Sequence, residues 1–261
     1  MSDPIRVYIA CSPNNDDLEA QAVLDYTLCS LTSRPVEITW MKLSRDPTSP
    51  FYSDAGGGWR TRRWATPFSG FRWAVPALAG FEGKAIYLDP DFIVRADIAE
   101  LWDQEFHSDK VAMVAKPGPS PRFCCSLWDC AKAKRFIPAL ADLQKDEEQH
   151  IKMTRFFGSR PDLLQQYVGE WNALDNMMRG LAFDDPRVKA IHYTHMPTQP
   201  HLMYARARLR AVGREHWIKN GKPHPSPLLQ SIFDTALREA QAAGYTLDKY
   251  TNDAMYGVRQ Q

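Results

Sequence analysis

The sequence predicts an α/β fold built around a parallel sheet. Strand-like apolar runs alternate with helix-like segments over about the first 195 of the 261 residues, which is typical of βαβ units. A hydrophobic content of 44% is enough for one sizeable domain to bury a full core. A third observation concerns chemistry, because one apolar run ends in two aspartates that a single proline separates.

The first βαβ unit occupies about the first 40 residues. The apolar run at residues 5–11 predicts a buried strand, and residues 36–41 predict a second one. Between them, apolar residues recur at helical spacing, and Asn15 or Asp16 is expected to cap this helix. A strand, a helix and a strand in this order indicate a parallel pair of strands.

The rest of the chain continues the alternation. Residues 44–63 are rich in Pro, Gly, Ser and charge, so we expect a surface loop or flap there. Residues 203–225 are basic and are expected to be irregular. We expect a catalytic domain over residues 1–202 and a helical appendage, packed on the same domain, over 203–261. Strands are expected at 110–116, 123–130 and 188–193, and helices at 69–78, 131–153, 161–179 and 227–243.

The two aspartates lie between the apolar runs 85–88 and 92–94. Alternate strand residues point to the same face, so Asp89 and Asp91 would lie roughly 6.5–7 Å apart along it. Pro90 cannot donate to a sheet ladder, which places the pair at a strand end or a bend. Two neighbouring carboxylates repel each other, and an oxygen-seeking divalent cation would relieve that repulsion. The alternative is a turn in which the aspartates merely end a strand.

Charge and cysteine content argue against several functional classes. The net charge of +1 provides no field that would recruit nucleic acid. The five cysteines are irregularly placed without a CxxC pair, which indicates neither a zinc site nor a disulfide framework. Reduced thiols, the absence of a signal-peptide pattern and the absence of a membrane-spanning stretch together predict a cytoplasmic protein.

The segment around the aspartates resembles a known family. Residues 85–94 read AIYLDPDFIV, Asp97 and the pair Leu101-Trp102 follow, and an Arg-x-x-x-Pro motif begins upstream at Arg72. This pattern is similar to the DxD segment of metal-dependent glycosyltransferases with the GT-A fold, of the glycogenin-like family 8 type, in a bacterial form. The resemblance implies a Rossmann-like α/β fold for nucleotide-diphospho-sugar transfer, with a mixed sheet flanked by helices.

The resemblance also implies a metal site. The pair His192-Tyr193 resembles the start of the family's C-terminal motif, whose first histidine completes the metal site. Asp89, Asp91 and His192 are therefore the expected ligands of Mn²⁺ or Mg²⁺. Strand alternation places His195 on the opposite face, so we expect it to lie outside the site. The alternative for His192 is a histidine that hydrogen bonds satisfy at a strand end.

The sequence departs from the family where a lysine contacts the donor diphosphate. Gln199 stands at that position and His201 replaces a tryptophan, so Arg72 or a basic residue among 206–214 is an alternative cation. A solvated basic face is the simpler interpretation of most of that cluster. By position in the family pattern, the expected donor-binding residues are Ala10, Cys11, Ser12, Asp89 and Gln199.

A further segment resembles the part of the family that binds sugars. Glu170 and Asn172 occupy this place and are expected to hold sugar hydroxyls through their carboxylate and amide groups. Trp171 either offers a flat apolar face or belongs to the core. Glu170, Asn172 and Arg72 are the expected catalytic residues.

These features together predict a metal-dependent glycosyltransferase. It would move a hexose from a nucleotide-diphosphate sugar, with UDP-sugars favoured, to a glycan or glycolipid acceptor with retention of configuration. The cation would neutralise the departing diphosphate. The basic, aromatic C-terminal segment would allow a peripheral contact at the inner membrane face.

Two alternatives stay open at this point. A relative that binds a nucleotide or glycan without turnover is consistent with the altered Gln199 and His201. A haloacid-dehalogenase-type phosphohydrolase also uses Asp-x-Asp after an apolar strand. That class needs Thr or Val where this chain has Ile93, and it places the motif on its first strand.

Overall fold

The computed structural model describes residues 3–54, 57–107, 109–176 and 181–252, and it divides into two compact units. Unit 1 comprises Met1–Cys11, Arg34–Asp89 and Ala99–Val168, and unit 2 comprises Ser12–Ser33, Pro90–Ile98 and Gly169–Gln261. Each unit contains a sheet of its own. The boundary expected after residue 202 lies within unit 2, and the division into a domain and an appendage stays a prediction.

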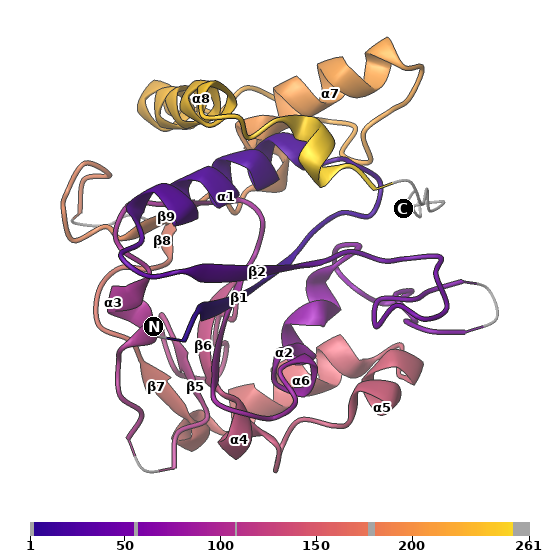
Figure 1. The fold of residues 1–261 in the computed structure, drawn as a ribbon, viewed down its shortest axis with the longest axis vertical. Helices are drawn as coiled ribbons and strands as arrows, with labels where there is room; N and C mark the ends of the chain where they lie inside the picture. The colour runs from indigo at the N-terminus through magenta and orange to yellow at the C-terminus, as the bar shows by residue number, and fades with distance from the viewer. Residues whose placement is uncertain (1–2, 55–56, 108, 177–180, 253–261) are drawn as a thin grey trace. The chain divides into compact units, whose positions relative to one another are not determined.

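Unit 1 contains a mixed six-stranded sheet in the order β2-β1-β3-β6-β5-β7 (Figure 1). In that order the strands span Val36–Met41, Ile5–Ala10, Lys84–Leu88, Cys125–Asp129, Ala112–Val114 and Leu164–Gln166. β1 pairs in parallel with β2 and β3, as the βαβ pattern predicts. β6 runs antiparallel to β3 and β5, while β5 and β7 are parallel. This arrangement confirms the mixed sheet that the resemblance implied.

Short helices flank this sheet. Both α2 and α4 contact β3 and β6. Trp73 is the centre of an aromatic cluster, with its ring centroid 4.7 Å from that of Phe123 and 5.6 Å from that of the stacked Phe157. The helices are α2 (Val75–Leu78), α3 (Ala99–Trp102), α4 (Cys130–Ala133), α5 (Leu140–Lys145) and α6 (Gln149–Ser159), with 3₁₀ turns at Ser69–Trp73 and Pro161–Leu163.

Unit 2 combines a small sheet with helices. Its strands are β4 (Phe92–Val94), β9 (Ala190–His192) and β8 (Ala173–Leu174), in that order. β9 pairs antiparallel with β4 and parallel with β8. The helix α1 (Leu18–Leu31) contacts both α7 (His201–Ala211) and α8 (Pro227–Ala242), as Figure 1 shows. Further 3₁₀ turns lie at Met196–Thr198 and Leu247–Tyr250.

The core of unit 2 lies between its sheet and its helices. Side chains from α1, the strands and α8 form one apolar cluster, which includes Val23, Ile191 and Phe233. The amphipathic helix predicted at residues 227–243 is confirmed, and the Ser226 hydroxyl caps it by accepting from the Leu229 amide at 3.3 Å. This packing gives the segment that carries His192 a rigid support.

Three sequence expectations about helices are wrong. No helix spans residues 161–179, whose described part forms a 3₁₀ turn and two short strands. Gly169 there adopts a φ of +89°, which ends helical geometry. Residues 201–211 are helical rather than irregular, because Leu202, Ala205 and Leu209 form a buried stripe at helical spacing. The helix expected over 131–153 is instead three shorter helices.

Two loop expectations had different outcomes. Neither Asn15 nor Asp16 caps α1, because its N-cap is Asp17 and Asn15 adopts a φ of +61°. The loop at residues 44–63 is confirmed over its described part, where only isolated bridges occur, and Trp59 in it is 2% exposed. Residues 55 and 56 of this loop lie outside the described residues. Among the described residues, no helix combines the length and the apolarity that crossing a bilayer requires.

Candidate active site

The first aspartate of the motif, Asp89, lies in unit 1 at the end of β3 and has a cation of its own. Arg72 Nη2 donates to both carboxylate oxygens, at 3.0 and 3.1 Å, and the Tyr87 hydroxyl donates to Oδ1 at 2.5 Å. The Arg72 and Asp89 side chains are only 13% and 10% exposed. Burial opposes the charge on Arg72, but the Asp89 carboxylate together with Tyr87 and Cys124 outweighs this effect and raises the pKa of the guanidinium.

The position of Arg72 is fixed by a tight turn. Gly70 is required there, because a Cβ would lie 2.2 Å from Gln149 Nε2 and 2.2 Å from the Trp64 ring. Gln149 Nε2 in turn donates to the Gly70 carbonyl at 3.1 Å. The 3₁₀ turn therefore holds the Arg72 side chain toward Asp89, and no feature of the local sequence around Gln149 indicated this.

His150 is a half-buried group near this ion pair. Its Nδ1 accepts from Trp73 Nε1 at 3.0 Å. Burial, reinforced by the positive charge of Arg72, lowers the pKa of His150 to about 4. The imidazole is therefore neutral at ordinary pH and adds no positive charge beside the Arg72–Asp89 pair. Sequence reasoning missed this residue, since an isolated histidine on a helix carries no recognisable signal.

The second aspartate, Asp91, belongs to unit 2 and faces a histidine. Asp91 Oδ1 lies 3.3 Å from His192 Nε2, and the two side chains are 14% and 3% exposed. The other ring nitrogen, Nδ1, lies 2.8 Å from the Asn172 side-chain oxygen. Asp91 Oδ1 is buried and accepts no hydrogen bond within the described part of the chain. The structure thus brings together Asp91, His192 and Asn172, of which the first two were expected metal ligands.

The Asn172 contact decides which ring nitrogen of His192 carries the proton. An amide oxygen can only accept, so Nδ1 must donate and Nε2 of the neutral ring presents a lone pair toward Asp91. A lone pair 3.3 Å from a carboxylate oxygen is repulsive unless a proton or a metal ion lies between them. Two ligand atoms at right angles on an ion, each at about 2.1 Å, are about 3 Å apart. The spacing of the pair therefore fits either a shared proton or a divalent cation.

Gln199 and Phe92 hold this pair in place. Gln199 Nε2 donates to Asp91 Oδ2 and, at 2.7 Å, to the Tyr193 carbonyl. The Phe92 ring stacks on the His192 imidazole at 4.1 Å with an interplanar angle of 15°, because the two residues are register partners in β4 and β9. Both amide hydrogens of Gln199 are therefore engaged within unit 2.

The remaining expected residues lie in varied surroundings. Trp171 is 1% exposed and belongs to the core, which decides between its two interpretations. Glu170 pairs through its backbone with Val188, and its side chain is half-buried. His195 is exposed and binds Thr198 Oγ1 at 2.8 Å, while His201 is buried, with burial lowering its pKa to about 4.

The expected donor-binding residues at the first strand are all buried. Ala10 ends β1 in unit 1, and Cys11 follows it. Ser12 begins the unit 2 loop, where its hydroxyl donates to Asp16 at 2.7 Å and its amide donates to Asp17 at 2.9 Å. Burial raises the pKa of Asp16 to about 6. The contribution of these three residues to a donor site stays a prediction.

A buried pair that the sequence did not suggest supports the end of β9. Asp175 Oδ2 lies 3.3 Å from His224 Nε2, and both side chains are at most 2% exposed. The Asp175 amide donates to the His192 carbonyl at 3.1 Å, and its carboxylate accepts from Thr194. Only the spatial proximity of residues 175 and 224 reveals this pair.

Comparison with known proteins identifies the fold that carries these residues. No family model matches the chain. Protein CDI of Arabidopsis thaliana is 28% identical over 215 residues, which cover 73% of this chain and 78% of CDI. The galactosyltransferase LgtC, solved with donor and acceptor sugar analogs, matches with a TM-score of 0.52 and 12% identity over 90% of this chain and 96% of LgtC.

Two larger glycosyltransferases match as well. GlyE of Streptococcus pneumoniae TIGR4 has a TM-score of 0.54 and 15% identity over 93% of this chain and 64% of GlyE. The bifunctional WbbM has a TM-score of 0.53 and 12% identity over 85% of this chain, which spans only about half of WbbM at 52%. At identities this low, the comparison concerns the fold alone. It does not favour the phosphohydrolase alternative. The chain has the GT-A fold of glycosyltransferases.

Proposed function

We propose that this protein is a metal-dependent glycosyltransferase that moves a hexose from a nucleotide-diphosphate sugar, with UDP-sugars favoured, to a glycan or glycolipid acceptor. The GT-A fold supports glycosyl transfer as the class of reaction. The observation that carries the proposal is the facing pair of Asp91 Oδ1 and His192 Nε2, 3.3 Å apart and buried.

The residues present fit a divalent cation. One carboxylate and one imidazole form a donor set suited to Mn²⁺ or Mg²⁺, and Asp91 Oδ1 lacks any other partner among the described residues. Asp89 is the third candidate ligand from the sequence, since only Pro90 separates it from Asp91. When bound, the ion would stabilise the negative charge that develops on the departing diphosphate.

The protein's own side chains then have distinct tasks. Asn172 fixes the tautomer of His192, and Phe92 fixes the plane of the ring. Gln199 orients Asp91 through its amide hydrogens, so we infer that it acts on the carboxylate and does not replace the diphosphate-binding lysine of the family. Glu170 is half-buried and lies two residues before Asn172 in the sequence. It is our candidate for holding sugar hydroxyls. Retention of configuration stays a prediction.

The first experiment measures release of free nucleotide from a panel of UDP-, GDP- and CMP-sugars, with mixed mono- and disaccharide acceptors. Each donor is tested with Mn²⁺ and with EDTA, for the wild type, Asp91→Asn and the surface control Asp142→Asn. We expect release from one donor, dependent on the metal, abolished in Asp91→Asn and unchanged in Asp142→Asn. Metal-dependent donor binding without release from any donor would instead identify a non-catalytic relative.

A further inference from the structure

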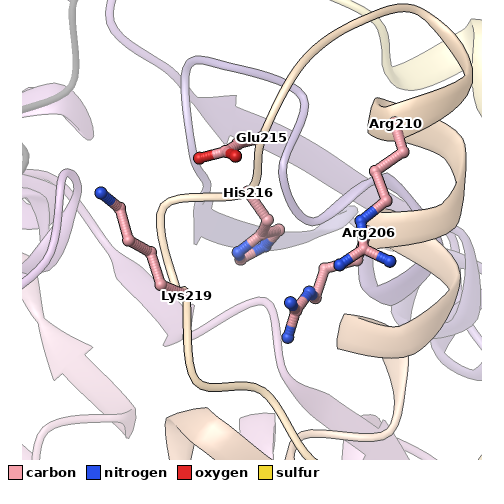
Figure 2. Close-up of a pocket in the computed structure, with 5 residues that line it drawn as sticks. All are labelled: Arg206, Arg210, Glu215, His216 and Lys219. Atoms are coloured by element: carbon pink, nitrogen blue, oxygen red, sulfur yellow. The ribbon is translucent and has the colours of Figure 1, made fainter.

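A small basic pocket lies in unit 2, and its two arginines belong to the basic stretch 206–214 that the sequence analysis named as alternative cations. Its volume is about 150 Å³, and it is lined by Arg206, Arg210, Glu215, His216 and Lys219 (Figure 2). Figure 2 shows both arginines projecting from the same helix, α7, while the other residues come from the segment that follows it. Drug-sized ligands need about 300–1,000 Å³, so this pocket suits a small group rather than a whole nucleotide sugar.

The basic residues of this stretch divide into two classes. Arg208 and Arg214 have structural partners, since Arg208 Nε binds Glu19 at 2.7 Å and Arg214 Nη2 donates to the Asn14 carbonyl at 3.0 Å. Arg206 uses one nitrogen, Nη1, for the Gly221 carbonyl at 3.1 Å. For the pocket's other cations, Arg210 and Lys219, the described residues supply no ion-pair partner.

His216 forms a wall of the pocket without adding charge. Its Nδ1 accepts from the Ile218 amide at 3.0 Å, so Nε2 carries the hydrogen and donates to the Asp16 carbonyl at 3.1 Å. Burial lowers the pKa of this imidazole to about 3. The charge in the pocket therefore comes from two guanidiniums and one ammonium, opposed only by Glu215.

We propose that this pocket binds a phosphate group, with Arg206, Arg210 and Lys219 as the cationic donors. Like charges four residues apart on one helix repel each other, and a bound anion would convert this repulsion into attraction. Guanidinium groups present forked donors that match phosphate oxygens. The ligand is a free phosphate ion or the phosphate of a sugar phosphate, and the proposal does not depend on glycosyl transfer.

The pocket is distinct from the proposed metal site within unit 2. Arg206 and Arg210 lie about 7.5 and 13.5 Å of helix rise beyond His201, at the start of α7. Neither arginine contacts Asp91, His192 or Gln199 in the interactions that the structure shows. An anion held here is therefore independent of the carboxylate–imidazole pair.

The test is calorimetric titration of the full chain, in EDTA, with inorganic phosphate and separately with glucose 6-phosphate. The variants are Arg210→Gln and Lys219→Gln, whose side chains are exposed and whose loss should not unfold the protein. Arg238→Gln, an exposed arginine on α8, is the matched control for net charge. We expect at least tenfold weaker binding in Arg210→Gln and Lys219→Gln, and wild-type binding in Arg238→Gln and Asp91→Asn.

Glu215→Gln provides a gain-of-function readout that a merely structural role would not produce. Removing the opposing carboxylate should tighten phosphate binding several-fold. Tighter binding of glucose 6-phosphate than of phosphate would identify a sugar-phosphate site, and the reverse would identify a free-anion site. Wild-type binding weaker than about 10 mM for both probes, equal weakening in Arg238→Gln, or loss of binding in Asp91→Asn would each overturn the proposal.

Discussion

Asp89 and Asp91 stand one residue apart in the sequence, but their surroundings differ in charge. In unit 1, both oxygens of Asp89 accept from Arg72, and Tyr87 donates to one of them. In unit 2, Asp91 receives one amide donor from Gln199 and directs its other oxygen at an imidazole nitrogen. One carboxylate thus has a permanent cation, whereas the other faces a second electron-pair donor. The motif supplies two identical residues, and the local fold gives them different electrostatic requirements.

The two surroundings have different energetic consequences. Removing one partner of a buried ion pair costs about 3–5 kcal/mol, because the other charge is left uncompensated. Arg72 and Asp89 form such a pair, so Asp89 contributes to stability. Asp91 has no arginine or lysine partner among the described residues, and a proton on His192 or an external cation would compensate its charge. We therefore propose that Asp89 serves mainly the fold and that Asp91 is the firmer metal ligand.

The largest effects should come from replacing each of the two aspartates by asparagine in turn. Asp91→Asn should lower Mn²⁺ affinity by more than about 100-fold with little change in unfolding temperature, because it removes a ligand and leaves no charge unpaired. Asp89→Asn should lower stability by about 3–5 kcal/mol, or about 10 °C, because it leaves the Arg72 guanidinium buried without its partner. Paramagnetic resonance of free Mn²⁺ and thermal unfolding measure the two quantities.

The variant Arg72→Leu provides the control for the ion pair between Arg72 and Asp89. Alone, it should destabilise the protein as strongly as Asp89→Asn, and combining the two substitutions should recover part of the loss. If Asp89→Asn and Asp91→Asn reduced metal affinity and stability in equal proportion, the contrast between the two carboxylates would be wrong.

A smaller effect is expected at Asn172, which acts through His192. Asn172→Ala removes the acceptor of the Nδ1 hydrogen and should lower Mn²⁺ affinity by about 10–100-fold, as the loss of outer-shell partners typically does. Asn172→Asp keeps that acceptor and should stay near the wild type. If Asn172→Asp were as damaging as Asn172→Ala in acceptor KM but not in metal affinity, the amide would instead hold a sugar hydroxyl.

The smallest effect concerns protonation near Asp89. The pKa of His150 is about 4 in the folded protein, below the ordinary value of 6.5, so the unfolded chain binds more protons between these values. Stability is therefore lost as the pH falls from 6.5 toward 4, and His150 should account for about 1–2 kcal/mol of that loss at pH 5. Denaturant unfolding at pH 7 and pH 5 measures this difference.

His150→Gln should show a shallower loss of stability on acidification than the wild type. His107→Gln, at an exposed histidine, should keep the wild-type slope. The buried histidines are the same in both variants, so the difference isolates His150. If stability fell equally with pH in the two variants, His150 would accept a proton in the folded protein as readily as in the unfolded chain, and the prediction would be wrong.

Local sequence patterns were sufficient for the strand framework and part of the site. Apolar runs of strand length located β1, β2 and β3, and their order along the chain predicted the parallel pairing of β1 and β2. His195 is exposed, as expected, but β9 ends at His192, so strand alternation does not account for its position. The successes with the strands share one cause, since periodicity and chain order are properties of neighbouring residues.

Sequence patterns failed where distant contacts override local preference. The segment 161–179 has helix-forming residues, but pairing of β7 with β5 and of β8 with β9 makes its short extended pieces more stable. The basic segment after residue 200 looked irregular because its arginines dominate the composition. Burial of Leu202 and Leu209 against the rest of unit 2 made it a helix.

The sequence by itself determined the α/β framework, the pair of aspartates and the histidine that could join them. Only the tertiary structure decided which group each side chain meets. Arg72 reaches Asp89 across 17 residues, His192 meets Asn172 across 20, and Gln199 reaches Asp91 across 108. Hydrogen bonds and buried charges depend on the distance between atoms, and only folding sets the distance between residues that lie far apart in the chain.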